Sequence, residues 1–448
     1  MDVLHVIHQF PPESRGGSES YVQDVAQRQR TLGLDVQVLS GSKHWHAKVT
    51  VESGEVDGLP VHRLHRDDLY FDHHAKMWHP EVERTFAELL QRWRPKLLHV
   101  HHWVRLTCNL VEIAAAQQIP AVVTVHDYYT SCPRAFRRRE DDEACRRELS
   151  AASCATCVPK HGHETPAELA AGVELFRDHY RAELSLARTT LVAVASTADL
   201  LAKTTGVPRD RYEVLPLGYR ARWPGQPKLP APRAGEPLRF SFWGGVGRHK
   251  GVDVLLRAFA LLHAARPGRA ELHVLGGAES EPFGAELRAL GNGLPVRFHG
   301  EFDAEQLRAS APHVGVFPST CLETFGLVLD ECFELGLPCI TSDLGALPER
   351  SGAAGLVARA GDERALAAAM QRFVDEPALW ANLRSRLPGP SPTLDAHVDA
   401  LLAVYERART QPPRAPFATP VTALRRILFL MQQRESALGK LVPPGGPK

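Results

Sequence analysis

Two series of short apolar runs that alternate with longer helical patterns are the main feature of this 448-residue sequence. In the first half the apolar runs are Val3–Ile7, Val36–Leu39, Leu97–His101, Ala121–Val125 and Leu191–Ala195. The second series has its runs at Leu238–Phe242, Ala270–Leu275, Val296–His299, Val314–Phe317 and Cys339–Ser342. Strands that alternate with helices form parallel sheets through right-handed crossovers. We therefore predict an α/β chain with two parallel-sheet domains and a ligand cleft between them.

A segment rich in Pro, Arg and Gly separates the two series. This segment, residues 219–236, has no sustained apolar period, which is typical of a linker. It predicts a first domain over residues 1–218 and a second over 237–393. A helix over 394–410 is expected to return to the first domain, and residues 411–448 are expected to form an extension.

The extension contains a second helical pattern at Val421–Leu438. Its apolar stripe comprises Leu424, Ile427, Leu428 and Met431. Such a stripe favours a helix docked on the body of the protein. The alternative is a helix on a membrane surface, because basic residues could contact anionic lipid. These are Arg425, Arg426 and Arg434.

The charges are nearly balanced, with 53 Lys and Arg against 52 Asp and Glu. This balance excludes a general nucleic-acid binder, which needs a basic excess to neutralise phosphates. Met1–His8 lacks the basic head and long apolar stretch of a signal peptide. The sequence has no run of about 18 apolar residues, so no transmembrane helix is expected. We therefore expect a cytoplasmic protein whose cysteines are thiols or metal ligands.

The segment Pro318–Glu331 follows a predicted buried strand and opens a helix. Its backbone N–H groups near residues 324–327 are expected to form a positive helix terminus that binds phosphate or a sugar hydroxyl. Glu323 and Glu331 are eight residues apart. With Glu323 in the loop and Glu331 about two turns into the helix, the pair could hold two hydroxyl-bearing parts of one extended ligand.

This segment resembles the E-x7-E signature of the retaining glycosyltransferases of family 4, which have the GT-B fold of two Rossmann-like domains. Further matching motifs occur in the family's order, so that the resemblance covers most of residues 1–408. They are Gly16-Gly17, His126-Asp127, Gly244, Lys250-Gly251 and Gly345–Glu349. The resemblance implies transfer of a sugar from a nucleoside-diphosphate sugar to an acceptor hydroxyl of a glycan, a lipid-linked intermediate or a small molecule, as in polysaccharide biosynthesis. It implies no cofactor for catalysis.

The resemblance also assigns roles in donor binding. Glu323 would contact hydroxyls of the donor sugar, and Glu331 would accept hydrogen bonds from the ribose. Lys250 would neutralise the diphosphate leaving group. The backbone that would hold the sugar and the distal phosphate belongs to Thr324, Phe325, Gly326 and Leu327.

One position departs from the family pattern. An Arg is usual where this chain has Gly245. Arg248 could supply the charge from a shifted position, or the loop amides could form a nest for the phosphates. An exposed loop cation is the other interpretation of Arg248.

In the first domain, the resemblance makes His126 a contact of the donor sugar or of the transition state; a core histidine is the alternative. Gly16 and Gly17 would let the backbone approach the donor phosphate or the acceptor. Histidines at another strand end have a spacing that could bind a metal, but cleft-lining or structural roles are favoured. They are His99, His101 and His102.

Four cysteines fall close together in an insertion over about residues 131–160: Cys132, Cys145, Cys154 and Cys157. One Cys-x2-Cys pair with two further thiols is typical of a structural zinc site. The insertion has little apolar content, so a metal would supply its ordering energy. An iron–sulfur cluster and free thiols are the alternatives. The remaining cysteines lie in apolar runs and are predicted to be buried: Cys108, Cys321, Cys332 and Cys339.

Three other functional classes stay open on the sequence. The missing Arg is compatible with a non-catalytic GT-B partner protein, and the cysteines with a metal-stabilised binding module. A GT-B epimerase or phosphorylase is less favoured, since no lysine stands out for the cofactor of a phosphorylase. The partners expected under the main hypothesis are a nucleoside-diphosphate sugar and a hydroxyl acceptor, with peripheral membrane contact as an option.

Overall fold

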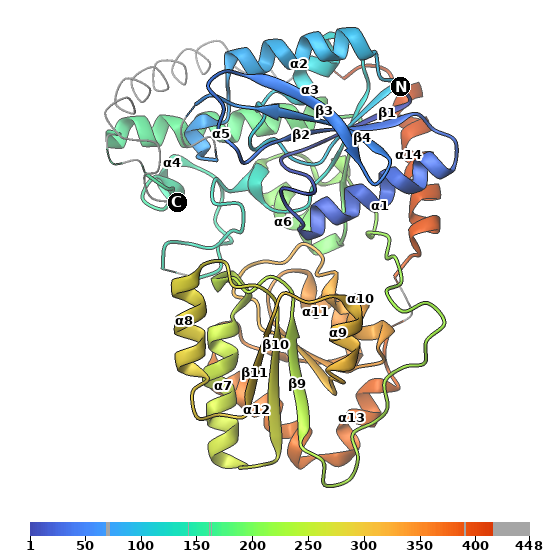
Figure 1. Cartoon of the computed structure of the whole chain (residues 1–448). Helices are drawn as coiled ribbons and strands as arrows, with labels where there is room; N and C mark the ends of the chain where they lie inside the picture. The colour runs from blue at the N-terminus through green and yellow to red at the C-terminus, as the bar shows by residue number, and fades with distance from the viewer. Residues whose placement is uncertain (69–71, 142, 161, 163, 389–390, 415–448) are drawn as a thin grey trace. The chain divides into compact units, whose positions relative to one another are not determined.

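The computed structural model describes residues 1–68, 72–141, 143–160, 162, 164–388 and 391–414. These residues divide into two compact units (Figure 1). The first unit comprises Met1–Ala135, Arg146–Gly218 and residues 394–414. The second comprises Phe136–Cys145 and Tyr219–Thr393. The predicted helix at Val421–Leu438 lies outside the described residues.

Among the described residues of the first unit, eight strands form one sheet in the order β3-β4-β2-β1-β5-β6-β7-β8. They are β1 (Val3–Ile7), β2 (Val36–Gly41), β3 (Thr50–Val56), β4 (Leu59–His65), β5 (Leu97–Val100), β6 (Ala121–Thr124), β7 (Thr189–Val192) and β8 (Tyr212–Val214). The helices are α1 (Gly17–Thr31), α2 (Pro80–Trp93), α3 (Leu110–Ala116), α4 (Ala151–Cys154), α5 (Pro166–Leu186), α6 (Ala195–Thr205) and α14 (Leu394–Thr410).

The order of strands follows from the burial of their side chains. Strand β1 has His5 among its apolar residues and is buried along its whole length, and it pairs in parallel with β2 and β5. Strand β3 is largely exposed and pairs antiparallel with β4 at the sheet edge. The sequence did not predict this hairpin, because β3 lacks a buried apolar face. The strand predicted at Leu191–Ala195 lies at Thr189–Val192 instead, since Ala195 begins α6.

Helix α14 packs on α1 within the first unit, and Figure 1 shows the two side by side. Polar contacts fix the pairing: Tyr21 Oη lies 2.8 Å from His397 Nε2, and Arg28 Nε lies 2.7 Å from Asp395 Oδ1. The apolar face of α14 is buried as well, with Val398 and Leu401 inaccessible to solvent. This face therefore completes the core of the first unit.

In the described part of the second unit, six strands form a parallel sheet in the order β11-β10-β9-β12-β13-β14. They are β9 (Leu238–Trp243), β10 (Ala270–Leu275), β11 (Val296–Gly300), β12 (Val314–Phe317), β13 (Cys339–Ser342) and β14 (Gly355–Ala358). The helices are α7 (Val252–Ala265), α8 (Glu281–Leu290), α9 (Ala304–Ala309), α10 (Val328–Glu334), α11 (Ala346–Ser351), α12 (Glu363–Asp375) and α13 (Pro377–Arg384). The predicted α/β class with two Rossmann-like parallel sheets is confirmed.

Part of the cysteine-rich insertion differs from its expected place. Residues 136–145 belong to the second unit and not to the N-terminal domain. Within that unit the ring of Phe136 stacks on His249, with 4.6 Å between centroids. Buried Arg137 donates from Nε to the Cys145 carbonyl oxygen at 2.9 Å, which folds the segment back on itself.

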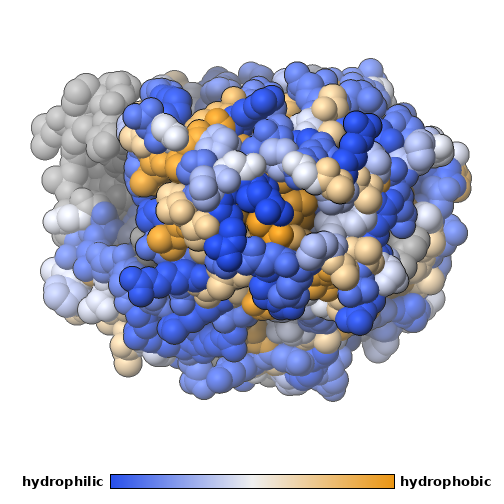
Figure 2. Space-filling model, turned by 90° about the horizontal axis from the view of Figure 1, so that it is seen from below, coloured by the Kyte–Doolittle hydropathy of each residue, from blue (hydrophilic) through white to orange (hydrophobic). Residues whose placement is uncertain are grey.

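The surface is mainly hydrophilic on the face that Figure 2 shows, with apolar residues in several separate patches. Scattered apolar residues of this kind are ordinary on a folded protein. None of the described helices has the length and apolar character needed to span a bilayer.

Candidate functional site

Three loops meet at the carboxyl edge of the second sheet. They follow β9, β12 and β13, which are neighbours in the sheet. Parallel strands present ligand-binding loops at this edge. The loops carry Lys250, Glu323 and Gly345, so that three separate sequence motifs come together in one place.

Lys250 and Glu323 form an ion pair at this edge. Lys250 Nζ lies 2.7 Å from Glu323 Oε1, and Ser319 Oγ donates to the same oxygen at 2.8 Å. Burial by itself would lower the pKa of Lys250, but the Glu323 carboxylate raises it. Burial would likewise raise the pKa of Glu323, but the lysine lowers it. Both groups are therefore charged at neutral pH.

Two glycines let these loops touch. Gly251 has φ +70°, and a Cβ there would lie 2.2 Å from the Pro318 carbonyl oxygen. Gly345 has φ +62°, and its Cβ would lie 2.3 Å from the Glu323 carbonyl oxygen, which accepts a hydrogen bond from Ala346 N at 2.8 Å. Any side chain at either position would push the loops apart.

Glu331 lies in the first turn of α10, not two turns into the helix as expected, because α10 begins at Val328. Trp243 Nε1 donates to Glu331 Oε2 at 2.9 Å, and Arg222 Nε lies 3.6 Å from Oε1. Burial raises the pKa of Glu331, an effect that outweighs Arg222. The carboxylate is thus held in a fixed orientation at the end of β9.

Arg350 holds the turn that precedes α10. Its guanidinium lies 3.6 Å from the Phe325 ring centroid and donates to the Gly326 carbonyl oxygen at 2.8 Å. The same group pairs with buried Asp330 at 2.7 Å. The segment Thr324–Leu327 is therefore fixed by one side chain of α11. Since α10 has only seven residues, its terminus is a minor source of charge beside Lys250.

Arg248 is exposed in this structure and is paired with the Glu286 carboxylate. Its guanidinium also lies 4.5 Å from the Phe283 ring centroid. The neighbouring His249 has a pKa lowered to about 4, by burial first and then by Lys250, with Arg138 of the insertion contributing in the same direction. The role of Arg248 at the donor stays a prediction.

In the first unit, Gly16 and Gly17 begin α1. A Cβ on Gly16 would lie 2.6 Å from Glu19 Oε2. Glu19 is buried and accepts hydrogen bonds from Gln9 and Ser14. Glycine is therefore suited to residue 16, because a side chain there would clash with the Glu19 carboxylate.

His126 follows the end of β6, as expected. Its Nε2 lies 2.9 Å from His101 Nδ1, and its ring centroid lies 5.1 Å from that of Tyr21. Burial lowers the pKa of His126 to about 4, so that the ring is neutral. The adjacent Asp127 accepts from His102 Nε2 at 3.1 Å and from Tyr129 N at 2.8 Å.

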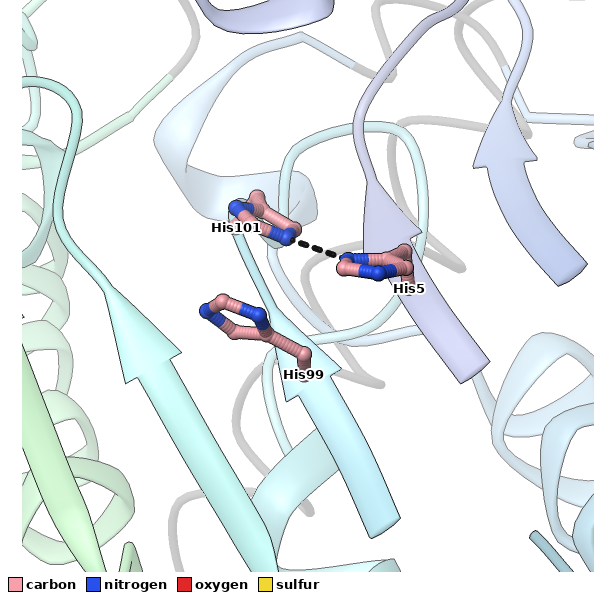
Figure 3. Close-up of side chains that lie close together, drawn as sticks. All are labelled: His5, His99 and His101. Carbon is pink, nitrogen blue, oxygen red and sulfur yellow. Dashed lines mark hydrogen bonds between the residues drawn. The ribbon is translucent and has the colours of Figure 1, made fainter. Parts of the chain in front are cut away.

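Three groups of potential metal ligands gather within 4.8 Å in the part of the chain that the structure describes. They are His5, His99 and His101; His46, Glu52 and His65; and Asp67, Asp68 and His79. In the first group, drawn in Figure 3, every ring nitrogen has a hydrogen-bond neighbour. In the second group the rings of His46 and His65 are stacked with 3.8 Å between centroids, so their in-plane lone pairs cannot both point at one ion. In the third Asp68 is paired with Arg66.

The cysteines divide by burial. The four predicted to be buried are buried: Cys108, Cys321, Cys332 and Cys339. Those of the insertion are partly exposed, and no three of them gather within 4.8 Å among the described residues. The zinc site stays a prediction.

Known protein families match both units. Residues 15–222 match the family described as Glycosyltransferase Family 4, and residues 237–376 match Glycosyl transferases group 1. The chain belongs to glycosyltransferase family 4. It is 27% identical over 410 residues to D-inositol 3-phosphate glycosyltransferase of Streptomyces griseus. This alignment covers 83% of this chain and 80% of that protein. It is 24% identical over 445 residues to glycogen synthase of Mycobacterium tuberculosis, with 93% and 98% covered.

Solved structures show the same GT-B fold. The Anabaena protein HepE in complex with UDP and glucose has a TM-score of 0.60 at 14% identity, with 91% of this chain and 99% of that chain covered. The catalytic domain of starch synthase IV from Arabidopsis thaliana, bound to ADP and acarbose, has a TM-score of 0.59 at 15% identity, with 92% and 99% covered. These structures therefore show the fold of this family 4 chain, which has the two Rossmann-like domains of GT-B.

Several residues of this site were not predicted from the sequence. Ser319 bonds Glu323, Trp243 bonds Glu331, and Arg350 fixes the turn between them. Ser319 lies four residues before Glu323, a spacing that could have indicated the contact. Trp243 and Arg350 come from other motifs, and only the folded sheet brings them to the site.

Proposed function

We propose that this family 4 enzyme transfers a sugar from a nucleoside-diphosphate sugar to an acceptor hydroxyl, with retention at the anomeric carbon. The observation that carries the proposal is the charged pair of Lys250 and Glu323 at the carboxyl edge of the second sheet. It combines a cation for a diphosphate with a carboxylate for sugar hydroxyls. The names of the relatives support the same chemistry, since those proteins act on inositol phosphate or glycogen, or bind UDP or ADP.

Lys250 acts on the leaving group. Its ammonium is held charged by Glu323, and a bound diphosphate would take over part of this interaction. As the glycosidic bond breaks, negative charge grows on the diphosphate, and a cation already in place lowers the barrier without reorganisation. Because Lys250 supplies this charge, the proposal needs no metal for the chemistry.

The two carboxylates divide the hydroxyl contacts of the donor. Glu323, relieved of part of its bond to Lys250, would accept hydrogen bonds from the sugar. Glu331 is oriented by Trp243 and would accept from the two ribose hydroxyls, since a carboxylate can accept two parallel bonds. The backbone of Thr324–Leu327, fixed by Arg350, would contact the sugar and the distal phosphate.

The acceptor is proposed only by its chemical class. We propose a hydroxyl of a glycan, a lipid-linked intermediate or a small molecule, bound on the first domain near Gly16, Gly17 and His126. We also propose a cytoplasmic location with optional peripheral membrane contact. Fractionation of cells that express the chain tests the location: recovery with the secreted fraction would contradict it.

The experiment for the activity is donor turnover. The purified protein is incubated with a panel of nucleotide sugars and acceptors, and released nucleoside diphosphate is measured together with the anomeric configuration of the product. We expect diphosphate release with at least one donor and a product with retained anomeric configuration. In Lys250→Ala we expect neither diphosphate release nor product. Lys203→Ala, at an exposed site on α6, is the matched control. Absence of turnover and binding with every donor would favour a non-catalytic partner protein.

A further inference from the structure

A carboxylate of α10 holds the start of the linker that precedes β9. Glu334 accepts hydrogen bonds from the backbone N–H groups of Arg222 and Trp223, each at 2.9 Å, and from Tyr219 Oη at 2.6 Å. Three donors on one carboxylate make a strong, charge-assisted anchor. The first residues of the linker are therefore fixed to α10 about one turn after Glu331.

Further contacts hold the same stretch of the linker in place. The Trp223 ring is buried, and its Nε1 donates to the Ala304 carbonyl oxygen at 3.1 Å. Leu229 N donates to the Leu335 carbonyl oxygen at 2.9 Å. The Arg222 side chain thus extends from a fixed backbone, which reduces the entropy that is lost when it takes one position.

The anchored backbone brings the Arg222 side chain to Glu331. Arg222 Nε lies 3.6 Å from Glu331 Oε1, while Trp243 Nε1 donates to the other carboxylate oxygen. The Glu331 side chain is 20% exposed, so its charge has little solvent around it. A charged neighbour therefore affects this carboxylate more than it would affect one on the surface.

The charged groups near Glu331 act in opposite directions. Burial raises the pKa of Glu331; against this effect Arg222 lowers it, whereas Asp330 and Glu334 of the same helix raise it further. Asp330 is itself paired with Arg350 of α11. Two uncharged titratable groups lie near Glu331 as well, both with pKa values raised first by burial: Tyr219 and Cys332. Arg222 is thus the main group that opposes burial at this carboxylate.

We propose that Arg222 is a positioning residue of the donor site: Glu334 holds it beside Glu331, and it keeps that carboxylate in the ionised form that accepts hydrogen bonds from the donor ribose. The inference rests on the proposed function, because the ribose belongs to the nucleoside-diphosphate sugar. It makes the linker a part of the donor site. Arg222 acts through Glu331 and not on the reacting atoms.

Titration of the free protein tests the placement of Arg222 without any ligand. The Glu331 carboxyl carbon is followed by carbon-13 NMR of the full chain labelled at glutamate, and its signal is assigned by its loss in Glu331→Gln. We expect Arg222→Leu to raise the pKa of Glu331 by about one unit, the low end for a close opposite charge, because Arg222 is 43% exposed. Arg222→Lys should restore a lower value. An unchanged pKa in Arg222→Leu would overturn the proposal.

Glu334→Leu tests whether Glu334 positions Arg222. Loss of the Glu334 charge alone would lower the pKa of Glu331, because a nearby negative charge disappears. Loss of the anchor has the opposite sign, since Arg222 is no longer held beside Glu331. We expect the pKa to rise, as in Arg222→Leu, and a fall would contradict the positioning role of Glu334. Glu334→Gln, which keeps one acceptor oxygen, replaces the leucine variant if that protein does not fold.

Binding of nucleoside diphosphates tests the role at the ribose. Dissociation constants of UDP, GDP, ADP, CDP and dTDP are measured by calorimetry from about pH 5 to about pH 8, on either side of the raised pKa. A pKa raised by one unit makes binding to Arg222→Leu up to about tenfold weaker at acid pH and leaves it unchanged at alkaline pH. Weakening by the same factor at every pH would show that Arg222 contacts the nucleotide itself, which contradicts the positioning role. Arg233→Leu, at an exposed site in the same linker, is the matched control and should behave as wild type.

The two measurements separate this inference from the proposed function. If none of the nucleotides binds the wild type, the proposed function fails together with the ribose contact of Glu331. The NMR titration then still decides whether Arg222 and Glu334 act on that carboxylate. If nucleotides bind, and Arg222→Leu binds them as the wild type does at every pH, the inference fails and the proposed function stands. Circular dichroism of each variant confirms that the compared proteins are folded.

Discussion

At the scale of single residues, the candidate donor site depends on a charged pair in a partly buried place. Lys250 and Glu323 each shift the pKa of the other toward the charged form, against the effect of burial. A pair of this kind is costly to break, since one charge is then left without its partner. Its presence at a loop edge is explained more simply by ligand binding than by stability, because apolar residues would stabilise such a place as well.

A double-mutant cycle separates the two roles of the pair. Lys250→Met should lower stability by about 1–3 kcal/mol, because Glu323 loses its counter-charge. Lys250→Met with Glu323→Gln should recover most of that stability. Both variants should lose activity about 100- to 1000-fold, as expected for a missing transition-state contact. Denaturant unfolding and donor turnover are the measurements, and activity recovered by the double variant would contradict the assigned role.

The pH dependence of donor binding tests Glu331. Its pKa lies above the ordinary glutamate value because of burial, and ribose hydroxyls need the ionised form as acceptor. As the pH falls through this raised pKa, the carboxylate is neutralised and the KM for the donor should rise. The rise should begin at a higher pH than for an ordinary glutamate. Glu331→Gln should show a high KM without this limb, and Glu305→Gln, at an exposed site on α9, should behave as wild type.

At the scale of elements, α11 holds the turn before α10. Arg350 contacts the Phe325 ring, the Gly326 carbonyl and Asp330 at once. Lysine keeps the charge but cannot reproduce the planar fork. Arg350→Lys should therefore cost about 1–3 kcal/mol of stability and raise the donor KM about tenfold. Thermal melts and steady-state kinetics check this, and a variant with wild-type KM would show that the turn is not part of the donor site.

The cysteine-rich insertion gives a second prediction at this scale. The residues Cys132, Cys145, Cys154 and Cys157 are partly exposed to solvent, which suits thiolate ligation. We predict about one zinc per chain in elemental analysis of the purified protein, and its loss in Cys154→Ser with Cys157→Ser. Less than about half an equivalent of zinc with no iron would contradict the prediction of a bound metal. An equivalent amount of iron would assign the site to a cluster instead.

At the scale of the whole molecule, the sequence predicted what local patterns can encode. Strand β1 and strand β12 were predicted at their observed bounds, since each is a buried run of mostly apolar residues. The GT-B fold followed from motifs in order along the chain. The exposed strand β3 and the partners of the site residues were missed. Trp243 beside Glu331 and Gln29 beside His5 depend on contacts between distant segments, and neither pair has a fixed spacing in the sequence.

The assignment of residues 136–145 shows the same limit. The sequence predicted an insertion in the first domain because these residues follow His126-Asp127 along the chain. Their packing is decided by single contacts such as Phe136 on His249, which composition does not reveal. The position of the insertion in the sequence could be predicted from the order of the motifs. Its packing contacts are known only from the folded structure.

Donor turnover by wild-type protein and Lys250→Ala tests whether Lys250 stabilises the departing diphosphate in a sugar transfer. Nucleoside diphosphate release from a nucleotide-sugar panel is measured with acceptor present, with Lys203→Ala as control. We expect release by the wild type and the control, with retained anomeric configuration, and a loss of at least about 100-fold in Lys250→Ala. Equal release by Lys250→Ala and the wild type would contradict it.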